Sequence, residues 1–292
     1  MDFSQTLVLL RGGGDLATGV AYRLHQAGFP LIVLELAKPL VVRRRVALAT
    51  AVTEGEVHIE NLHGCLVESP RAALALAGQG VIPVLVAAKL PEWPTLPPKG
   101  PLSGPLSADR YAARWSQCGH PAAAIVDARM AKKNIDTAID QADHVIALGP
   151  GFTAGHDCHA VIETMRGHRL GRVIWQGEAQ ANTGTPGEIA GKGAERVLRS
   201  PCAGPVSWRY EIGDRVTAGA LLGTVGDQTV KAPFAGVLRG LIAPGTIVRK
   251  GLKIGDLDAR NDREACFTIS DKALAVGGGV LEALLVRLRK LG

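Results

Sequence analysis

An apolar run that ends in a glycine-rich turn, within residues 145–163, constrains the fold of this chain most strongly. The four apolar residues 145–148 are typical of a buried strand, and the glycines within 149–155 favour a tight turn after it. Apolar residues at helical spacing then predict a helix that begins near His156. A strand, a glycine turn and a helix N-terminus together favour an anion site, because unpaired backbone N–H groups point at one spot.

A second glycine turn lies near the start of the chain, inside a strand–helix–strand pattern. An apolar run at 6–10 precedes the turn 12–14, helical spacing continues as far as Gly28, and the next apolar run ends at Glu35. Glycines at 12 and 14, an alanine at 17 and an acid about 20 residues later match the dinucleotide-binding fingerprint. Two interpretations stay open: a nucleotide site, or glycines that only permit a tight turn and close helix packing. Asp15 disfavours a pyrophosphate in this turn unless its carboxylate caps the helix.

Apolar strands alternate with helices throughout residues 1–194, a rhythm that predicts an α/β domain. We expect a doubly wound, Rossmann-like and mainly parallel sheet. Ligands of such sheets gather at the carboxyl ends of the strands. The candidate binding residues at these strand ends are Gly12, Gly13, Gly14, Asp15, Glu35, Asp127, Lys132, Gly149, Gly151, Thr153 and Gly155.

The second half of the chain contains an internal repeat with an offset of 32 residues. Pro201, Gly213 and Gly223, for example, recur at 233, 245 and 255, between short runs typical of strands. This pattern predicts a small all-β module with two-fold symmetry at 195–260, and it resembles the biotinyl/lipoyl-type barrel-sandwich hybrid. The connection 225–230 has neither the lysine nor the methionines of such carriers, so we expect no biotin or lipoate.

The last segment, 261–292, is predicted to form a strand and then a helix. Cys266 begins a strand-like run, and leucines and valines stand at helical spacing from Val280 to Leu288. Because this apolar helix face needs a partner, we expect the segment to return to the α/β domain. The β module is then an insertion.

Composition and charge limit the function classes. The 292 residues carry a net charge of +6, which is compatible with anionic ligands, but scattered basic residues and 4% aromatics argue against nucleic acid. The chain has no apolar run of about 18 residues, so we expect no membrane span. The five cysteines are far apart and form no C-x-x-C pair, which disfavours a zinc ribbon or a disulfide framework. We therefore expect the protein in the cytoplasm.

The candidate catalytic residues are Cys158, His159 and Glu163. On the predicted helix, His159 and Glu163 stand at i and i+4, a spacing that suits a metal or an acid/base pair. Because only two ligands share this helix face, we expect no metal site, and local bonding at a helix end is the alternative explanation. A helix N-terminus lowers the pKa of a thiol, so Cys158 is a candidate thiolate or selenium carrier. The alternative is a small buried side chain.

Several long blocks of sequence are distinctive. They include Arg-Gly-Gly-Gly-Asp-Leu-Ala-Thr-Gly at 11–19, Asp-Ala-Arg-Met-Ala-Lys-Lys-Asn at 127–134 and Leu-Gly-Pro-Gly-Phe-Thr-Ala-Gly at 148–155, with further blocks at 54–57, 159–164, 171–174, 182–187, 266–272 and 277–282. Across nearly the whole chain, these blocks resemble the YqeB-type accessory proteins of the selenium-dependent molybdenum hydroxylase system. The resemblance implies a maturation factor that holds the molybdopterin dinucleotide, or a nucleotide precursor, while selenium or sulfur is fitted to the metal centre. The pyrophosphate of such a ligand suits two glycine turns.

Three function classes stay open. The first is this maturation factor, whose partners are the hydroxylase apo-enzyme, other maturation factors and a small nucleotide ligand. The second is an NAD(P)-dependent oxidoreductase, which Gly12, Gly14 and Glu35 favour. The third is a non-catalytic adaptor whose β module docks the apo-hydroxylase. The motifs do not decide between an enzyme and a non-enzyme, and we expect a homo-oligomer.

Overall fold

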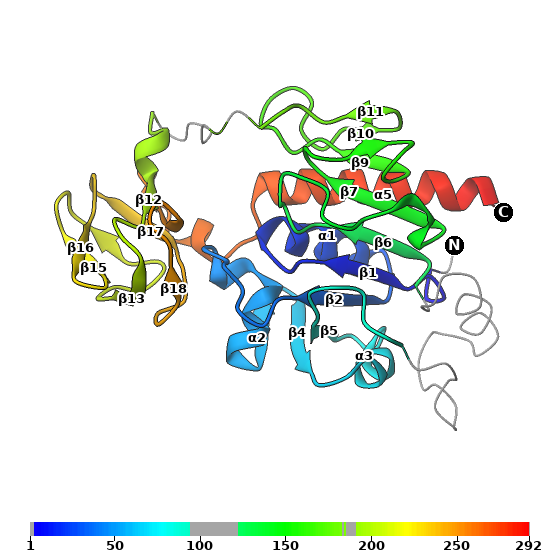
Figure 1. Ribbon diagram of the computed structural model, residues 1–292, viewed down its shortest axis with the longest axis horizontal. Helices are drawn as coiled ribbons and strands as arrows, with labels where there is room; N and C mark the ends of the chain where they lie inside the picture. Colours follow the sequence, from blue (N-terminus) through cyan, green and yellow to red (C-terminus); the bar gives the residue numbers. More distant parts are fainter. Residues whose placement is uncertain (1–2, 94–121, 183, 185–190, 292) are drawn as a thin grey trace. The chain divides into compact units, whose positions relative to one another are not determined.

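The computed structural model of the chain describes residues 3–93, 122–182, 184 and 191–291 (Figure 1). The chain forms two compact units. The first comprises Met1–Pro39, Leu48–Asn182 and Ser270–Gly292, and the second comprises Leu40–Ala47 and Thr183–Ile269. The second unit thus takes in a short segment from early in the chain, which the expected domain boundaries at 194 and 260 do not include.

A nine-stranded sheet forms the centre of the first unit, in the order β10-β9-β7-β6-β1-β2-β5-β4-β3. Six neighbouring pairs of strands are parallel, and the outermost pair at each edge is antiparallel. The strand β1 is central, with Val8 paired to Leu31 of β2 on one side and to Ala124 of β6 on the other. The strands are β1 (Val8–Arg11), β2 (Leu31–Glu35), β3 (Glu56–Ile59), β4 (Leu62–Val67), β5 (Ile82–Val86), β6 (Ala124–Asp127), β7 (His144–Leu148), β9 (Ala160–Ile162) and β10 (Val173–Ile174).

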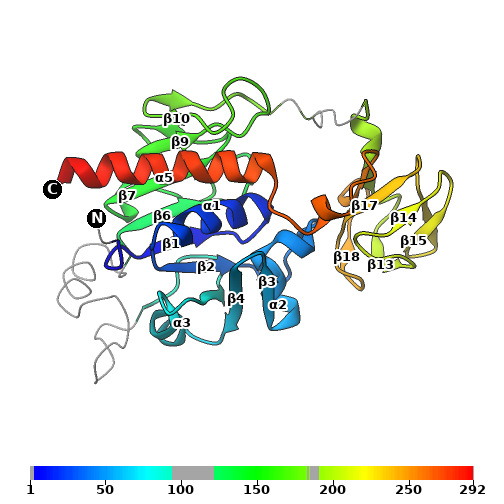
Figure 2. The ribbon, with the colours of Figure 1, turned by 180° about the vertical axis from the view of Figure 1, so that it is seen from behind.

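Two long helices, α1 (Asp15–Gln26) and α5 (Asp271–Leu291), pack side by side on one face of this sheet (Figure 2). Gly19 of α1 and Gly277 of α5 permit the close approach, because a Cβ atom on either would lie 2.3 Å from a backbone oxygen of the other helix. On the opposite face, the core includes Leu9, Phe152 and Leu74 of the short helix α3 (Pro70–Leu76). Among the described residues of this unit, the other helical segments are α2 (Ala51–Glu54) and the 3-10 turns Leu48–Thr50 and Ile139–Gln141.

Two separate four-stranded antiparallel sheets form the second unit, around a core that includes Leu222, Val237 and Leu257. Their orders are β12-β19-β17-β14 and β16-β15-β13-β18. The strand pairings of the two sheets are related by the repeat. The pairing of β13 with β15 in one sheet corresponds to the pairing of β17 with β19, 32 residues later, in the other. The strands are β12 (Val197–Arg199), β13 (Gly204–Trp208), β14 (Arg215–Val216), β15 (Leu221–Val225), β16 (Gln228–Lys231), β17 (Gly236–Leu241), β18 (Ile247–Val248) and β19 (Lys253–Asp258). The unit also contains the 3-10 turns Arg44–Val46, Ala194–Arg196 and Glu264–Cys266, the last in place of the expected strand.

The predicted fold class needs correction. A Rossmann-like, doubly wound sheet places helices between successive strands on both faces, but the chain after β7 continues as the strands β8 (Thr153–Ala154), β9 and β10. The strand β8 pairs with β11 (Gly177–Glu178) in a small sheet of its own. The structure therefore has one large mixed sheet and several small antiparallel sheets, instead of a Rossmann-like domain that carries a biotinyl/lipoyl-like barrel-sandwich module.

Among the residues that the structure describes, no helix is both long and apolar enough to cross a membrane.

Candidate functional site

The candidate site lies where β1, β6, β7 and β9 end. These strands are parallel neighbours, so their carboxyl ends meet at one edge of the nine-stranded sheet. Arg11 and Asp127 are directly paired as the last residues of β1 and β6. Most of the predicted binding residues lie at or just after these strand ends.

A network of two arginines and two aspartates joins the ends of β1 and β6. The Nε atom of Arg129 donates to both carboxylate oxygens of Asp127, at 3.1 and 3.2 Å. Asp136 accepts from Arg11 at 2.7 Å and pairs with Arg129 at 2.8 Å. The hydroxyl of Thr137 donates to Asp127 at 2.7 Å and accepts from Arg11 at 3.1 Å. These contacts tie the loop after β6 to the end of β1.

This network is mostly buried and electrically balanced. Asp127 is 1% exposed and Arg11 is 2% exposed. Burial lowers the pKa of Arg11, as does the charge of Arg129, and the two carboxylates only partly offset this. For Asp136, burial raises the pKa, but the hydrogen bond from Arg129 and the two positive charges outweigh burial and lower it. Two guanidinium groups face two carboxylates, so the network holds the loop in place and is not itself an anion site.

The loop held by the network has an unusual backbone. Met130 and Lys132 adopt positive φ angles of 55° and 62°, which are uncommon for residues other than glycine. This loop contacts the turn after β7, because a Cβ atom on Gly151 would lie 2.5 Å from the Cα atom of Lys133. Strained backbone held by surrounding contacts is frequent at ligand-binding loops.

In the first glycine turn, backbone groups contact other parts of the chain. The N–H of Gly13 donates to Glu35 at 2.7 Å, and the second carboxylate oxygen of Glu35 accepts from the N–H of Leu36 at 2.6 Å. The carbonyl oxygen of Gly13 accepts from the N–H of Ala49 at 2.8 Å. A Cβ atom on Gly12 would lie 3.0 Å from the backbone of the loop after β6. Close packing therefore explains the first two glycines.

The end of this turn leads into α1. Gly14 is the N-cap residue of α1, no side chain caps the helix there, and Asp15 is the first helical residue. The positive end of the helix dipole and the side chain of Asp15 thus lie together at the strand ends.

The second glycine turn differs from its prediction, because no helix begins near His156. Gly149 donates its N–H to the carbonyl of Ile162 at 2.9 Å, and Gly155 lies in a tight turn within 153–158. Thr153 donates its N–H to Asp157 at 2.8 Å and its hydroxyl to Glu178 at 2.9 Å. Thr153 therefore supports a turn and does not cap a helix.

The predicted pairing of His159 and Glu163 is wrong for the same reason. His159 precedes β9 and accepts from the N–H of Val145, near the start of β7, at 2.9 Å. Glu163 follows β9 at the carboxyl edge and accepts from the N–H groups of Met165 and Gln180 at 2.7 and 2.8 Å. The two side chains lie at opposite ends of a strand, so they cannot form a metal or acid/base pair.

Cys158 is buried in the core of the first unit and lies at no helix N-terminus. Burial raises the pKa of its thiol to about 12, and the negative charge of Asp157 contributes to this. A raised pKa keeps the sulfur protonated, which removes the physical reason for a thiolate or selenium carrier here.

Lys272, at the start of α5, is a residue that the sequence did not single out. It is half-buried, and burial lowers the pKa of its ammonium group, whereas the charges of Asp15 and Glu163 act in the opposite direction. Arg129 and Thr137 were also missed. A signal existed for two of these three residues, because Arg129 and Lys272 belong to the distinctive blocks at 127–134 and 266–272.

Comparison with known proteins gives one sequence relative of note. No family model matches the chain. The uncharacterized protein YqeB from Escherichia coli K12 is 45% identical over 284 residues, which are 97% of this chain and 48% of YqeB. The chain therefore spans about half the length of the curated relative that it matches.

Solved structures show only remote similarity. An aspartoacylase family protein from Mesorhizobium loti is 11% identical, with 87% of this chain and 85% of that chain covered and a TM-score of 0.26. A succinylglutamate desuccinylase/aspartoacylase from Rhodobacter sphaeroides is 14% identical, with 88% and 86% covered and a TM-score of 0.25. Similarity this low indicates neither an activity nor a ligand for the chain. The match to YqeB, by contrast, confirms the expected resemblance to YqeB-type proteins across almost all of this chain.

Proposed function

We propose that this chain is an accessory factor in the maturation of selenium-dependent molybdenum hydroxylases. In this role it binds a nucleotide or the molybdopterin dinucleotide where β1, β6, β7 and β9 end. The observation that carries the proposal is the loop 128–137, which the buried Arg–Asp network holds in a strained conformation against the second glycine turn. The resemblance to YqeB-type proteins supports the biological role, and the chemistry of the loop supports an anionic ligand.

Two cations available to such a ligand are on this loop. Lys132 and Lys133 are exposed, and among the described residues neither ammonium group has an ion-pair partner. An exposed lysine is a compact charge that suits phosphate oxygens. The N–H of Gly13 already donates to Glu35, so we place the phosphates beside the lysines and the second turn, and not in the first turn.

Calorimetric titration of the full chain with CTP, CMP, NAD and molybdopterin dinucleotide tests this proposal. We expect binding of a cytidine nucleotide or of the molybdopterin dinucleotide, and at least about tenfold weaker binding after Lys132→Ala combined with Lys133→Ala, because hydrogen bonds to charged groups contribute about 1.5–3 kcal/mol. Lys250→Ala, at an exposed lysine of the second unit, is the matched control. Failure of all four ligands, or binding that the double variant leaves unchanged, contradicts the proposal.

The alternative functions predict different outcomes in this titration, in a turnover assay and in a capture experiment. Binding of NAD alone, with turnover of an alcohol or acid, favours an oxidoreductase, although Glu35 must then exchange its two backbone partners for a ribose. Capture of an apo-hydroxylase by the full chain without any nucleotide favours an adaptor. We also propose a cytoplasmic location and a homo-oligomeric state, which fractionation and light scattering test.

A further inference from the structure

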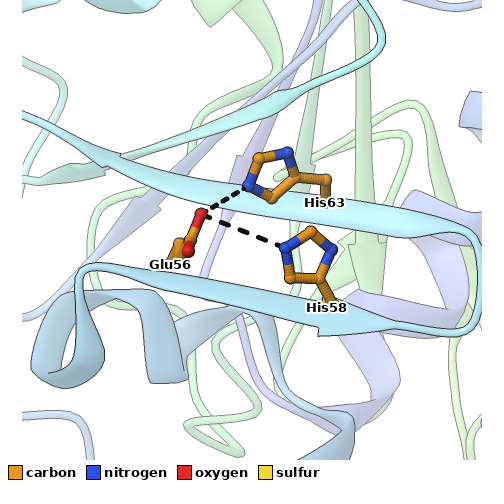
Figure 3. Close-up of side chains that lie close together, drawn as sticks. All are labelled: Glu56, His58 and His63. Carbon is orange, nitrogen blue, oxygen red and sulfur yellow. Dashed lines mark hydrogen bonds and ion pairs between the residues drawn. The ribbon is translucent and has the colours of Figure 1, made fainter.

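The hairpin of β3 and β4 presents three ligand-type side chains on one face, at the opposite edge of the nine-stranded sheet from β9 and β10 (Figure 3). His58 and His63 are directly opposite each other in the register of the hairpin, and Glu56 precedes His58 by two residues on β3. The alternate residues Val57 and Ile59 are buried. The three polar side chains therefore share the outer face, because successive residues of a strand point to opposite faces.

The ligand atoms of the three side chains converge on one point. An oxygen of Glu56 lies 2.9 Å from Nε2 of His63 and 4.0 Å from Nε2 of His58. All three ligand atoms lie within 4.8 Å of one another. In Figure 3, both rings turn a nitrogen toward the same carboxylate, which lies to one side of the two rings. The two imidazole rings are stacked, with centroids 4.2 Å apart and planes 13° from parallel.

This spacing is close to that of a coordination sphere. Zinc bonds to nitrogen and carboxylate oxygen are about 2.0–2.2 Å long, so ligands of a tetrahedral ion are roughly 3.3 Å apart. The observed 2.9 and 4.0 Å between Glu56 and the two histidines lie on either side of that value. The pairing of the two strands fixes the positions of the three ligands. Val57 and Gly64 are paired and buried, so the neighbouring residues of the hairpin point to the opposite, outer face.

We propose that Glu56, His58 and His63 bind a divalent transition-metal ion of the zinc class. Two imidazoles and one carboxylate suit zinc, nickel or copper, whereas magnesium and calcium prefer sets made only of oxygen. Three protein ligands leave one position open to water. The side chains of His58, Glu56 and His63 are 66%, 61% and 32% exposed, so an ion reaches them from solvent. This site is separate from the proposed nucleotide site and does not depend on it.

The test is a calorimetric titration of the tag-free, chelator-treated full chain with Zn²⁺. We expect one site that His58→Ala, His63→Ala and Glu56→Gln each weaken at least about tenfold, since even removal of an outer-sphere partner costs 10–100-fold in affinity. All three positions are on the surface of a hairpin, and circular dichroism verifies that the variants fold.

His156→Ala is the matched control. His156 has a side chain 86% exposed and a carboxylate neighbour in Asp157, but it lies outside the hairpin. Zinc affinity that is unchanged in this variant, and reduced in the three hairpin variants, supports the proposal. Absence of zinc binding by the wild-type chain, or zinc affinity that is equal in the wild-type chain and in all three hairpin variants, overturns it.

Discussion

The backbone N–H of Gly13 donates to a carboxylate oxygen of Glu35 at 2.7 Å. The sequence predicts both residues as parts of a nucleotide site. In the folded chain the two bind each other, and the second oxygen of Glu35 accepts from Leu36. The Gly13–Glu35 contact thus gives the first glycine turn a structural role without any ligand.

Replacement of the Glu35 carboxylate tests how much the Gly13–Glu35 contact stabilises the fold. We expect Glu35→Gln to lower the free energy of unfolding by about 1.5–3 kcal/mol, because an amide has one acceptor oxygen where the carboxylate offers two to backbone N–H groups. Urea denaturation of the variant, beside Glu92→Gln at an exposed position, provides the measurement. Equal losses in the two variants contradict the structural role.

The buried charge network predicts a large effect for Asp127. Asp127→Asn leaves the charge of Arg129 without its closest partner, and disruption of a buried pair typically costs about 3–5 kcal/mol. Thermal and urea unfolding should therefore both show strong destabilisation. Asp140→Asn, at an exposed aspartate just beyond the same loop, should stay within about 0.5 kcal/mol of the wild type. A small effect at Asp127 would falsify the claim that the network holds the loop.

The contact between the loops after β6 and β7 can be tested at Gly151. Gly151→Ala adds a Cβ atom that would lie 2.5 Å from the backbone of Lys133, at a residue whose φ is +102°. Gly28→Ala has a similar φ of +86° but meets nothing within 4 Å, so it isolates the cost of the backbone conformation. We expect Gly28→Ala to lower the free energy of unfolding by about 1–2 kcal/mol. Gly151→Ala should lower it by a further 1–3 kcal/mol, roughly. Matching unfolding curves for the two variants argue against close contact of the loops.

The thiol of Cys158 should be inert in the native protein. With a pKa of about 12, it is almost entirely protonated at pH 8, and its side chain is buried. Alkylation by iodoacetamide, followed by peptide mass spectrometry, should label the half-buried Cys65 first and Cys158 only after denaturation. Labelling of both at similar rates in the native state would revive the idea of a reactive Cys158.

His159 should make the stability depend on pH. Burial lowers the pKa of its imidazole, and the positive charge of Arg287 adds to this, although the charge of Asp143 acts against it. The folded state thus favours the neutral ring, whose Nδ1 accepts from the N–H of Val145. The pKa of histidine in the unfolded chain is about 6.5. As the pH falls below this value, the unfolded state binds the proton before the folded state does. The free energy of unfolding therefore decreases until the pH reaches the lower pKa of the folded state.

His159→Asn should therefore flatten the decrease in unfolding free energy between pH 7.5 and 5.5. Urea titrations at the two pH values provide this difference. His156→Asn removes an exposed histidine three residues away and should keep the wild-type pH dependence. If the pH dependence is the same in the wild type and in both variants, His159 is not its source.

Local patterns predicted the start of the fold well. The strand, turn, helix and strand from Val8 to Glu35 follow the expected order, because strand periodicity, glycine and helical spacing agree there. The repeat offset of 32 residues also relates the pairing of β13 with β15 to that of β17 with β19, although the sequence did not predict which strands pair. From Val8 to Glu35, the local sequence pattern therefore agrees with the final secondary structure.

The prediction of a helix after Gly155 was wrong because the local sequence pattern fits two structures. A short apolar run is compatible with a buried strand or a helix segment, and Ala160–Ile162 is buried throughout as β9. The carboxylate of Asp157, which could have capped a helix, instead accepts from the N–H of Thr153 four residues earlier. Only the place beside β7 in the sheet decided between the two structures.

The Arg–Asp network could not be predicted from the sequence either. Arg11 and Asp136 are 125 residues apart, and nothing in their spacing marks them as partners. They meet because β1 and β6 are neighbours, and this pairing follows from the packing of the whole sheet. Contacts of this kind depend on strand order, which periodicity does not encode.

The two sheets of the second unit are interlocked. Each has a central pair of strands from one copy of the repeat, flanked by strands from the other: β12 and β14 flank β19 and β17, and β16 and β18 flank β15 and β13. A copy alone therefore forms one hairpin pair, which is marginal in water. During synthesis neither sheet can close until the ribosome has passed β18 and β19, so the first copy must wait, incompletely paired, for the second.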